Sequence, residues 1–252
     1  MTPPPRPVTV VTGGGRGIGA ATAVHLAREG HDLALGYLGD DASAQDVLAA
    51  VRATGARAVA VRGDVTDEDD VEALFAAAAG LGPVTGLVAG AGVTAHLGDL
   101  ADTPVAVVRR VVDVDLVGVL LCARRAAQVM STSRGGTGGA VVVVSSSAAT
   151  LGSPHEYVHY AAAKAGVDAL AVGLAEELAA EGVRVNAVAP GLVRTGIHAG
   201  AGDPGRLERV VSRVPTGRAG EPQEIVAPAI AWLLGDQASY VTGAVLRVAG
   251  GL

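Results

Sequence analysis

Short valine-rich runs alternate with alanine-rich stretches along nearly all of the 252 residues, and no other feature constrains the fold more strongly. The runs are apolar at consecutive positions, as expected for strands that helices cover on both faces. They lie at 8–11, 32–37, 57–61, 86–89, 140–144, 183–188 and 244–248. The predicted helices between them cover 18–29, 41–53, 67–79, 104–130, 157–181 and 222–234. Because strand and helix alternate, we predict an α/β fold, a doubly wound parallel sheet of seven strands with helices on both faces.

No long linker or break in composition divides this pattern. We therefore expect a single domain over 8–252, preceded by a flexible, proline-rich N-terminal tail at 1–7. Half of the residues are hydrophobic, which is enough for one large core. Only S-T-S-R-G-G-T-G-G at 131–139 is typical of a flexible segment, and we predict a surface loop between a helix and a strand there.

Charge and hydropathy exclude several classes of partner. The formal net charge of -6 argues against nucleic acid, because such binding needs clustered Lys and Arg to neutralise phosphates. No segment reaches the roughly 18 uninterrupted apolar residues that span a bilayer, and the N-terminal stretch M-T-P-P-P-R-P contains no apolar run after its arginine. We therefore expect a cytoplasmic protein without membrane contact. The lone Cys122 lies within V-L-L-C-A and is predicted to be a small buried hydrophobe.

The stretch T-G-G-G-R-G-I-G at 12–19 directly follows the first predicted strand. Glycine permits a tight turn and lets a phosphate approach the backbone, and the N-terminus of the next helix offers free N–H donors. A glycine-rich turn alone is weak evidence in a chain with 36 glycines, but its place after the first strand predicts dinucleotide binding in a Rossmann fold. The residues that we expect to contact the cofactor here are Gly13, Gly15, Arg16, Gly17, Ile18 and Gly19.

A second motif, Y-A-A-A-K, places Tyr160 and Lys164 on one face of a predicted helix. A phenol with a pKa of about 10 exchanges protons poorly at neutral pH, but a nearby ammonium lowers that pKa. Such a phenol can exchange a proton with a carbonyl or alcohol oxygen. The pair follows three serines at the carboxyl end of the fifth predicted strand, which is the edge where doubly wound sheets bind ligands. Three signals therefore point to one edge, although an isolated pair of this kind is more often a packing Tyr beside a solvated Lys.

The order of glycine-rich loop, serine and Y-x-x-x-K resembles the short-chain dehydrogenase/reductase family over nearly the whole chain, and is similar to its 3-oxoacyl-carrier-protein reductases and glucose-dehydrogenase-like oxidoreductases. Further matches are G-D-V at 63–65, R-V-N-A-V-A-P-G at 184–191 and Y-V-T-G-A-V-L-R-V-A-G-G at 240–251. The resemblance implies that Tyr160 is the acid/base, that Lys164 binds the nicotinamide ribose and lowers the pKa of Tyr160, and that Ser146 holds the substrate oxygen. Ser147 is the alternative, since the commonest family spacing before the Tyr selects it.

The resemblance also implies cofactor contacts beyond the glycine loop, with Asp64 near the adenine and the Pro190–Gly191 turn along the nicotinamide carboxamide. Tyr160 and Lys164 are also expected to contact the cofactor. The other residues that we expect to contact it are Asp64, Val65, Ala89, Gly90, Ala91, Pro190, Gly191, Val193 and Thr195.

Two positions depart from the family pattern. The usual N-N-A-G is A-G-A-G at 89–92, which keeps small residues but loses both amides. Asp115 stands where the family has an Asn that anchors the water of a proton relay, and we include it in the catalytic set. An ionised carboxylate accepts hydrogen bonds but donates none. It would also attract the Lys164 ammonium, partly offset its effect on Tyr160 and so raise the pKa of that phenol. We therefore predict slower catalysis or a shifted pH optimum.

The cofactor is expected to be NADP(H), with NAD(H) as the alternative. The second predicted strand ends at 36–38 without the acidic residue that would bind the ribose of NAD. Arg16 matches a position that is basic in NADP-preferring relatives, and its fork suits a phosphate. Asp40 and Asp41 follow closely and leave NAD(H) open, and Arg16 is alternatively a solvent-facing loop charge.

The substrate pocket is expected between three loops, at 93–97, 152–159 and 197–205. His96, His155 and His198 fall in them, either as groups that orient a polar substrate or as solvated loop histidines, and no spacing suggests a metal site. The segment 197–205 is either a lid or an exposed connector. The resemblance, together with the weakly charged helices at 104–130 and 157–181, suggests a homo-oligomer, a tetramer.

We therefore predict an NADP(H)-dependent ketoreductase that transfers a hydride between nicotinamide and a small-molecule carbonyl or alcohol substrate. Two alternatives remain. One is a cofactor-binding scaffold or sensor with weak catalysis, and the other is a biosynthetic reductase of an imine or a conjugated double bond.

Overall fold

Seven parallel strands form one sheet in the order β3-β2-β1-β4-β5-β6-β7. The computed structural model describes residues 6–197 and 202–252. The strands are β1 (Val8–Thr12), β2 (Asp32–Tyr37), β3 (Ala58–Arg62), β4 (Val84–Ala89), β5 (Gly139–Val144), β6 (Val183–Pro190) and β7 (Val245–Val248). The chain runs outward from β1 to β3 and then returns to β4 beside β1, so the winding reverses there. In such sheets the loops at the carboxyl ends part at the reversal and leave a crevice.

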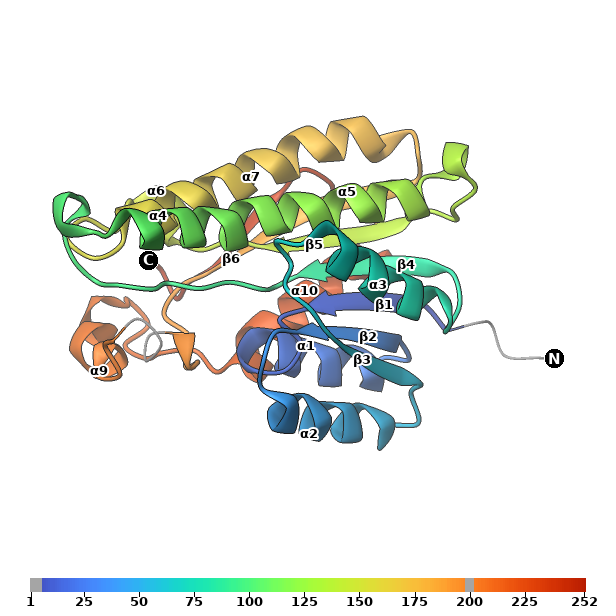
Figure 1. Ribbon diagram of the computed structural model, residues 1–252, viewed down its shortest axis with the longest axis horizontal. Coiled ribbons are helices and arrows are strands. Elements are labelled where there is room, and N and C mark those ends of the chain that lie inside the picture. Colours follow the sequence, from blue (N-terminus) through green and yellow to red (C-terminus); the bar gives the residue numbers. More distant parts are fainter. Residues whose placement is uncertain (1–5, 198–201) are drawn as a thin grey trace.

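Helices cover both faces of the sheet (Figure 1). One face packs against α3 (Glu68–Ala79), α5 (Gly118–Met130) and α7 (Val158–Ala179). The other face packs against α1 (Gly17–Arg28), α2 (Asp41–Arg52) and α10 (Ala227–Leu234). The fold predicted from the sequence is confirmed, and the seven-stranded sheet with helices on both faces forms a single domain of the Rossmann type.

The valine runs are apolar at every position because neighbouring residues face different layers of helices. Val10 belongs to the core on the side of α3, α5 and α7, whereas Val11 belongs to the core on the side of α1, α2 and α10. In β5, Val141 and Val143 face the first core, and Val142 faces the second. This alternation is the two-residue period of a strand with no solvent-exposed face.

Two of the predicted helices contain wider turns. The helix predicted at 104–130 consists of α4 (Val105–Val112), the π-helical turn η2 (Asp113–Val117) and α5, and the helix predicted at 222–234 begins with the π-helical turn η5 (Pro222–Val226). Such turns are common at functional sites. The sequence did not indicate the short elements η1 (Leu100–Asp102), α6 (Ala148–Leu151), α9 (Arg206–Val210), η4 (Val211–Arg213) and η6 (Asp236–Ala238). The predicted loop at 131–139 contains the 3-10 turn η3 (Thr132–Arg134), and its last residue begins β5.

The last two residues of the N-terminal tail predicted at 1–7 contact the domain. Residues 1–5 lie outside the described residues, but the Arg6 side chain donates hydrogen bonds to the carbonyls of Gly30 and Gly55. The carbonyl of Pro7 accepts a hydrogen bond from the backbone N–H of Asp32. Residues 6 and 7 are therefore fixed to the domain. Within 6–197 and 202–252, no helix has the length and apolar character to traverse a bilayer.

Candidate active site

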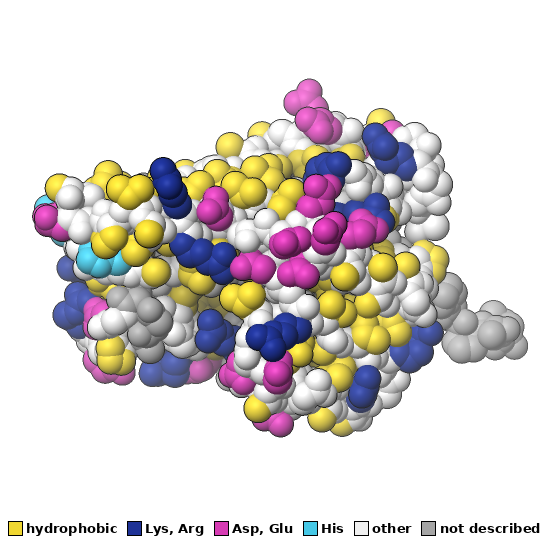
Figure 2. Space-filling view, in the orientation of Figure 1, with side chains coloured by type: hydrophobic (Ala, Val, Ile, Leu, Met, Phe, Trp, Pro, Cys, Tyr) yellow, Lys and Arg dark blue, Asp and Glu magenta, His cyan; other side chains and the backbone are white. Residues whose placement is uncertain are grey.

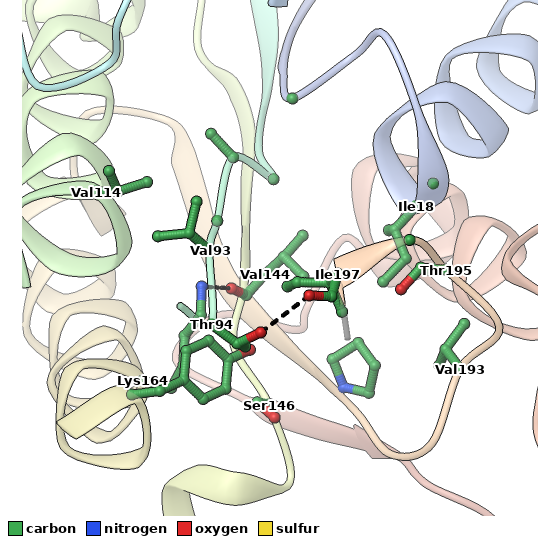
Figure 3. A pocket seen from close by; sticks show the side chains of 18 of the residues that line it. Ile18, Val93, Thr94, Val114, Val144, Ser146, Lys164, Val193, Thr195 and Ile197 are labelled. Carbon is green, nitrogen blue, oxygen red and sulfur yellow. Dashed lines mark hydrogen bonds between the residues drawn. The ribbon is translucent and has the colours of Figure 1, made fainter. Parts of the chain in front are cut away.

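A cavity of about 1030 Å³ lies where the winding of the sheet reverses. The loops that follow β1 to β6 all contribute to its lining, and Figure 3 shows part of it. α9 lies apart from the sheet, at the end of the molecule where α6 and the start of α4 lie (Figure 1). The volume is large enough for an extended ligand together with a smaller second molecule.

The glycine loop after β1 forms a floor that leaves no room for side chains. A Cβ at Gly19 would lie 2.2 Å from the carbonyl oxygen of Gly13, and a Cβ at Gly13 would lie 3.0 Å from the backbone of Ala91. The Thr12 hydroxyl holds the loop after β4 against this floor by accepting hydrogen bonds from the N–H groups of Gly90, at 3.1 Å, and Ala91, at 3.2 Å. The helix-capping residue of α1, Arg16, makes no side-chain cap hydrogen bond in the described structure. The bare backbone and the first turn of α1 therefore fit a pyrophosphate.

Arg16 and Asp40 lie at one end of the cavity but differ in what they contact. Arg16 is exposed and forms no salt bridge with any described residue. Asp40 caps α2, since its carboxylate accepts hydrogen bonds from the backbone N–H of Ser43, at 3.0 Å, and from the Ser43 hydroxyl, at 2.7 Å. These hydrogen bonds lower the pKa of Asp40. Its carboxylate is thus committed to the helix end.

Asp64 lies in the same cavity and carries a partner that the sequence did not indicate. Arg110, from α4, forms a salt bridge of 3.0 Å with the Asp64 carboxylate and also lines the cavity. Burial raises the pKa of Asp64, but hydrogen bonds from Thr66 and the pairing with Arg110 bring it below its usual value. Nothing in the local sequence marks Arg110, because α4 reaches the site only through the packing of the domain.

Ser146, Tyr160 and Lys164 converge on one wall of the cavity. The Lys164 Nζ donates a hydrogen bond of 2.9 Å to the carbonyl of Val144, drawn in Figure 3, and lies 3.3 Å from a carboxylate oxygen of Asp115. The same Nζ is 5.7 Å from the centroid of the Tyr160 ring. The ammonium is therefore held between α7, the end of β5 and η2.

The pKa of the Tyr160 phenol is raised in the described protein, whereas the sequence predicted a lowered pKa. Burial raises the pKa of Tyr160, the carboxylate of Asp115 raises it further, and a side-chain hydrogen bond with Ser146 lowers it, with a net rise. The net pKa is higher than expected in the protein as described, because burial of the phenol and the charge of Asp115 outweigh the lowering predicted for Lys164. The predicted direction of the Asp115 effect agrees with this geometry.

Asp115 is completely buried in η2 and does not line the cavity, but its charge acts on both Lys164 and Tyr160. Its carboxylate accepts hydrogen bonds from the backbone N–H of Val93, at 3.2 and 3.3 Å. A Cβ at Gly92 would lie 2.7 Å from Asp115 Oδ1, so this glycine allows the loop after β4 to pass the carboxylate. Burial raises the pKa of Asp115, although Lys164 opposes the rise.

Most of the site residues named from the sequence line the cavity. Those that do are Gly13, Gly15, Arg16, Gly17, Ile18, Gly19, Asp64, Val65, Gly90, Ala91, Ser146, Tyr160, Lys164, Pro190, Gly191, Val193 and Thr195. Ala89 does not, because it ends β4 inside the hydrophobic core. The alternative serine, Ser147, also lines the cavity, but the hydrogen bond that bears on the phenol comes from Ser146.

The loop histidines do not line the cavity where they are described. His155 is exposed and pairs with Asp99 at 2.7 Å, and the buried Nε2 of His96 has no hydrogen-bond partner among the described residues. His198 and most of the first half of the expected lid lie outside the described residues. Ile197, before that gap, is fixed by a 3.1 Å hydrogen bond from the Thr94 hydroxyl to its carbonyl, shown in Figure 3. Glu156 and Tyr157, in the predicted pocket loop at 152–159, line the cavity, whereas sequence reasoning missed the polar lining residues Arg206 and Arg213.

Known proteins with a similar sequence and fold identify the family of this chain. A family model described as enoyl-(acyl carrier protein) reductase matches residues 13–252. A solved structure of a short chain dehydrogenase from Burkholderia cenocepacia, in complex with NADP, is similar at a TM-score of 0.88 and 31% identity, over 97% of this chain and 97% of that one. The chain belongs to the short-chain dehydrogenase/reductase family. It is an NAD(P)-dependent oxidoreductase that acts on substrates of the alcohol and ketone type.

Two relatives within the short-chain dehydrogenase/reductase family are similar over nearly the full length. The chain is 46% identical to the cis-4-hydroxycyclohexanecarboxylate dehydrogenase of Sinomonas cyclohexanicum, over 97% of this chain and 95% of that protein. It is 40% identical to the L-rhamnose 1-dehydrogenase (NAD(P)(+)) of Sphingomonas sp. (strain SKA58), over 96% of this chain and 94% of that protein.

Proposed function

We propose that the protein is an NADP(H)-dependent ketoreductase that interconverts a small carbonyl compound and its alcohol, with Tyr160 as the acid/base. The observation that carries the proposal is the convergence of Ser146, Tyr160 and Lys164 on one wall of the cavity that the glycine loop also lines. When bound, the cofactor supplies or accepts the hydride. The protein's own contribution is to bind, orient and exchange the proton.

The residues of the site fit such a cofactor along the whole cavity. The backbone of the glycine loop and the first turn of α1 would hold the pyrophosphate, Asp64 and Arg110 would border the adenine, and Lys164 would reach the nicotinamide ribose. Arg16 would bind a 2′-phosphate, since it has no salt bridge of its own among the described residues and Asp40 is committed to capping α2. We therefore favour NADP(H), with NAD(H) as the weaker alternative.

We expect Tyr160 to give its proton to the substrate oxygen. Because burial raises the pKa of Tyr160, the phenol stays protonated at neutral pH, which is the form that reduction requires. As the carbonyl carbon gains a hydride, the oxygen gains the Tyr160 proton, while the Ser146 hydroxyl donates a hydrogen bond to that oxygen. Oxidation runs the same transfer backward and needs the phenolate, so we expect it to be faster at alkaline pH.

The test is the substitution Tyr160→Phe, assayed by NADPH oxidation with a panel of small ketones. We expect kcat to fall by about 10²- to 10⁴-fold, because general acid catalysis contributes about that factor. Binding of NADPH, followed by its fluorescence, should change little. Tyr240→Phe is the matched control, since Tyr240 is fully exposed and lies outside the cavity. Turnover that survives the loss of the Tyr160 hydroxyl would remove this phenol from its proposed role.

A second candidate function is a cofactor-binding scaffold with weak catalysis. It is favoured by the buried Asp115, which pairs with the ammonium of Lys164. The wild-type protein would then bind NADPH but reduce none of the ketones. Adding an imine and a conjugated enone to the panel tests the third possibility, a reductase of another double bond.

We further propose a homo-oligomer, a tetramer, located in the cytoplasm. Hydrophobic side chains gather on the surface over α5 and α7 (Figure 2). On these helices, Leu120 in α5 is 41% exposed and Val172 in α7 is 54% exposed, and Val117, which ends η2 just before α5, is 37% exposed. Covering such a surface with a second copy would bury it. Light scattering coupled to gel filtration tests this, and a monomer at micromolar concentration would contradict it.

A further inference from the structure

A group of charged and aromatic side chains lies at the end of the cavity away from the glycine loop. Arg206, in α9, donates a hydrogen bond of 2.6 Å from Nη2 to the Tyr157 hydroxyl and also contacts the carboxylate of Glu156. Its Cζ lies 5.0 Å from the centroid of the Tyr157 ring. That ring meets the Tyr160 ring edge-on, with centroids 5.4 Å apart. The guanidinium is thus separated from the proposed acid/base by a single aromatic ring.

Arg206 has more donors than the described protein uses. The residue is only 7% exposed, and its Nε and Nη1 are buried without a hydrogen-bond partner in 6–197 and 202–252. Leaving a buried charged donor unpaired costs more than leaving a neutral one, so an acceptor that met these atoms would bind favourably. Arg206 also lines the cavity, which is where a ligand would supply that acceptor.

Tyr157 adds a further donor beside this guanidinium. Burial raises the pKa of Tyr157 to about 12, so its hydroxyl keeps its proton at any physiological pH. The oxygen accepts from Arg206, which leaves the proton free to be donated to another group. Both side chains line the cavity, and both are suited to an acceptor with more than one oxygen.

The net charge at this end of the cavity is positive. The charged lining residues here are Arg206, Arg213 and Glu156, and Arg213 forms no salt bridge with a described residue. Glu156 is in addition shared with Arg209, which is half exposed and does not line the cavity. A neutral substrate would leave the excess charge without a partner, whereas a substrate with one negative charge would complement it.

Apolar side chains also line the cavity. Val93, Ala148, Leu151 and Val210 line it, and Leu252 joins them from the C-terminus. A short hydrocarbon chain or ring would pack against these side chains. The cavity therefore combines a proton donor, apolar lining and a cationic group.

We propose that Arg206, together with Tyr157 and Arg213, binds the carboxylate of an oxo acid or hydroxy acid whose reacting carbon lies a short apolar distance away. The inference rests on the proposed function, since it takes Tyr160 as the reacting end. Because Nε and Nη1 are covered by protein atoms, they reach the carboxylate by rotation of the flexible Arg206 side chain. Arg206 is a specificity residue in this proposal and takes no part in the proton transfer.

The experiment compares three ketones that differ only at the far end: 4-oxocyclohexanecarboxylate, its methyl ester and cyclohexanone. We expect the wild-type protein to prefer the acid over the ester by at least about tenfold in kcat/KM, the effect of one charge-assisted hydrogen bond. Arg206→Met should remove this preference with little change in turnover of cyclohexanone, and Arg206→Lys should restore part of it. Arg209→Met is the matched control and should retain the preference, because Arg209 contacts Glu156 but not the cavity.

Several outcomes would overturn the inference while leaving the proposed function intact. These are equal turnover of acid and ester, a preference that survives Arg206→Met, and a stronger preference for a phosphate ester of a hydroxyketone. If no ketone is reduced, the proposed function fails, and calorimetric binding of the acid to wild-type protein and to Arg206→Met still decides the inference. If Arg206→Met does not fold, Tyr157→Phe and Arg213→Met replace it, and each should reduce the preference several-fold.

Discussion

The two ends of the cavity are built in different ways. The end with the glycine loop is made mainly of backbone, since Gly13, Gly19 and Gly90 approach one another at distances that exclude side chains. The end with α9 is made of long side chains, and Arg206 and Tyr157 reach each other from segments that are 49 residues apart. Backbone at the ends of parallel strands is positioned by the register of the sheet, whereas the side-chain end depends on how separate segments pack. The first end is therefore rigid and general, and the second is open to adjustment for one substrate.

The largest expected effect comes from placing a side chain in the backbone end. Gly19→Ala puts a Cβ 2.2 Å from the carbonyl of Gly13, so the loop must move. We expect NADPH affinity to fall by 100-fold or more, about 3 kcal/mol, measured by fluorescence titration. Gly173→Ala is the control, because no atom lies within 4 Å of its Cβ position in α7. Nearly unchanged affinity in Gly19→Ala would show that this loop does not hold the cofactor.

A smaller effect, on the preference for NADPH over NADH, is expected from Arg16, a side chain of the glycine loop. Arg16→Ala removes the proposed partner of the 2′-phosphate without altering the glycine loop. We expect the ratio of kcat/KM for NADPH to that for NADH to fall by about tenfold, the value of roughly one charge-assisted hydrogen bond. Arg28→Ala, at the exposed end of the same helix, should leave the ratio unchanged. A wild-type preference for NADH would refute the assignment of Arg16 directly.

The smallest expected effect is a shift in the pH–rate profile of alcohol oxidation, caused by the buried Asp115, which does not line the cavity. The negative charge of Asp115 raises the pKa of Tyr160, so Asp115→Asn should lower that pKa. Alcohol oxidation needs the phenolate, and its pH–rate profile should therefore move toward lower pH. Asp113→Asn, which removes an exposed charge from the same π-helical turn, is the control. An unchanged profile in Asp115→Asn would mean that Asp115 does not act on the phenol.

Much of the fold and of the backbone end could be predicted from the sequence, because both follow from short-range patterns. Val10 and Val11 face opposite cores, and this gives the continuous apolar run that identified the strand. The spacing of Tyr160 and Lys164 placed them on one helical face, and the parallel strands brought their helix to the same edge as the glycine loop. Ala89 lies in the core and not along the cavity, because the pattern did not show where β4 ends and the cavity begins.

The sequence by itself determined the architecture, the glycine floor and the position of the Tyr–Lys pair, since hydrophobic period and glycine content are local properties. Only the tertiary structure decided which groups surround that pair. It paired Arg110 with Asp64 and set Arg206 against Tyr157, whereas the pairing of Asp115 with Lys164, at 3.3 Å, was expected from the family resemblance. The pKa of a buried phenol depends on desolvation and on charges from other segments, and neither quantity is encoded by the residues next to it. Burial and the charge of Asp115 together raise the pKa of Tyr160, although a lowering by Lys164 was predicted from the sequence.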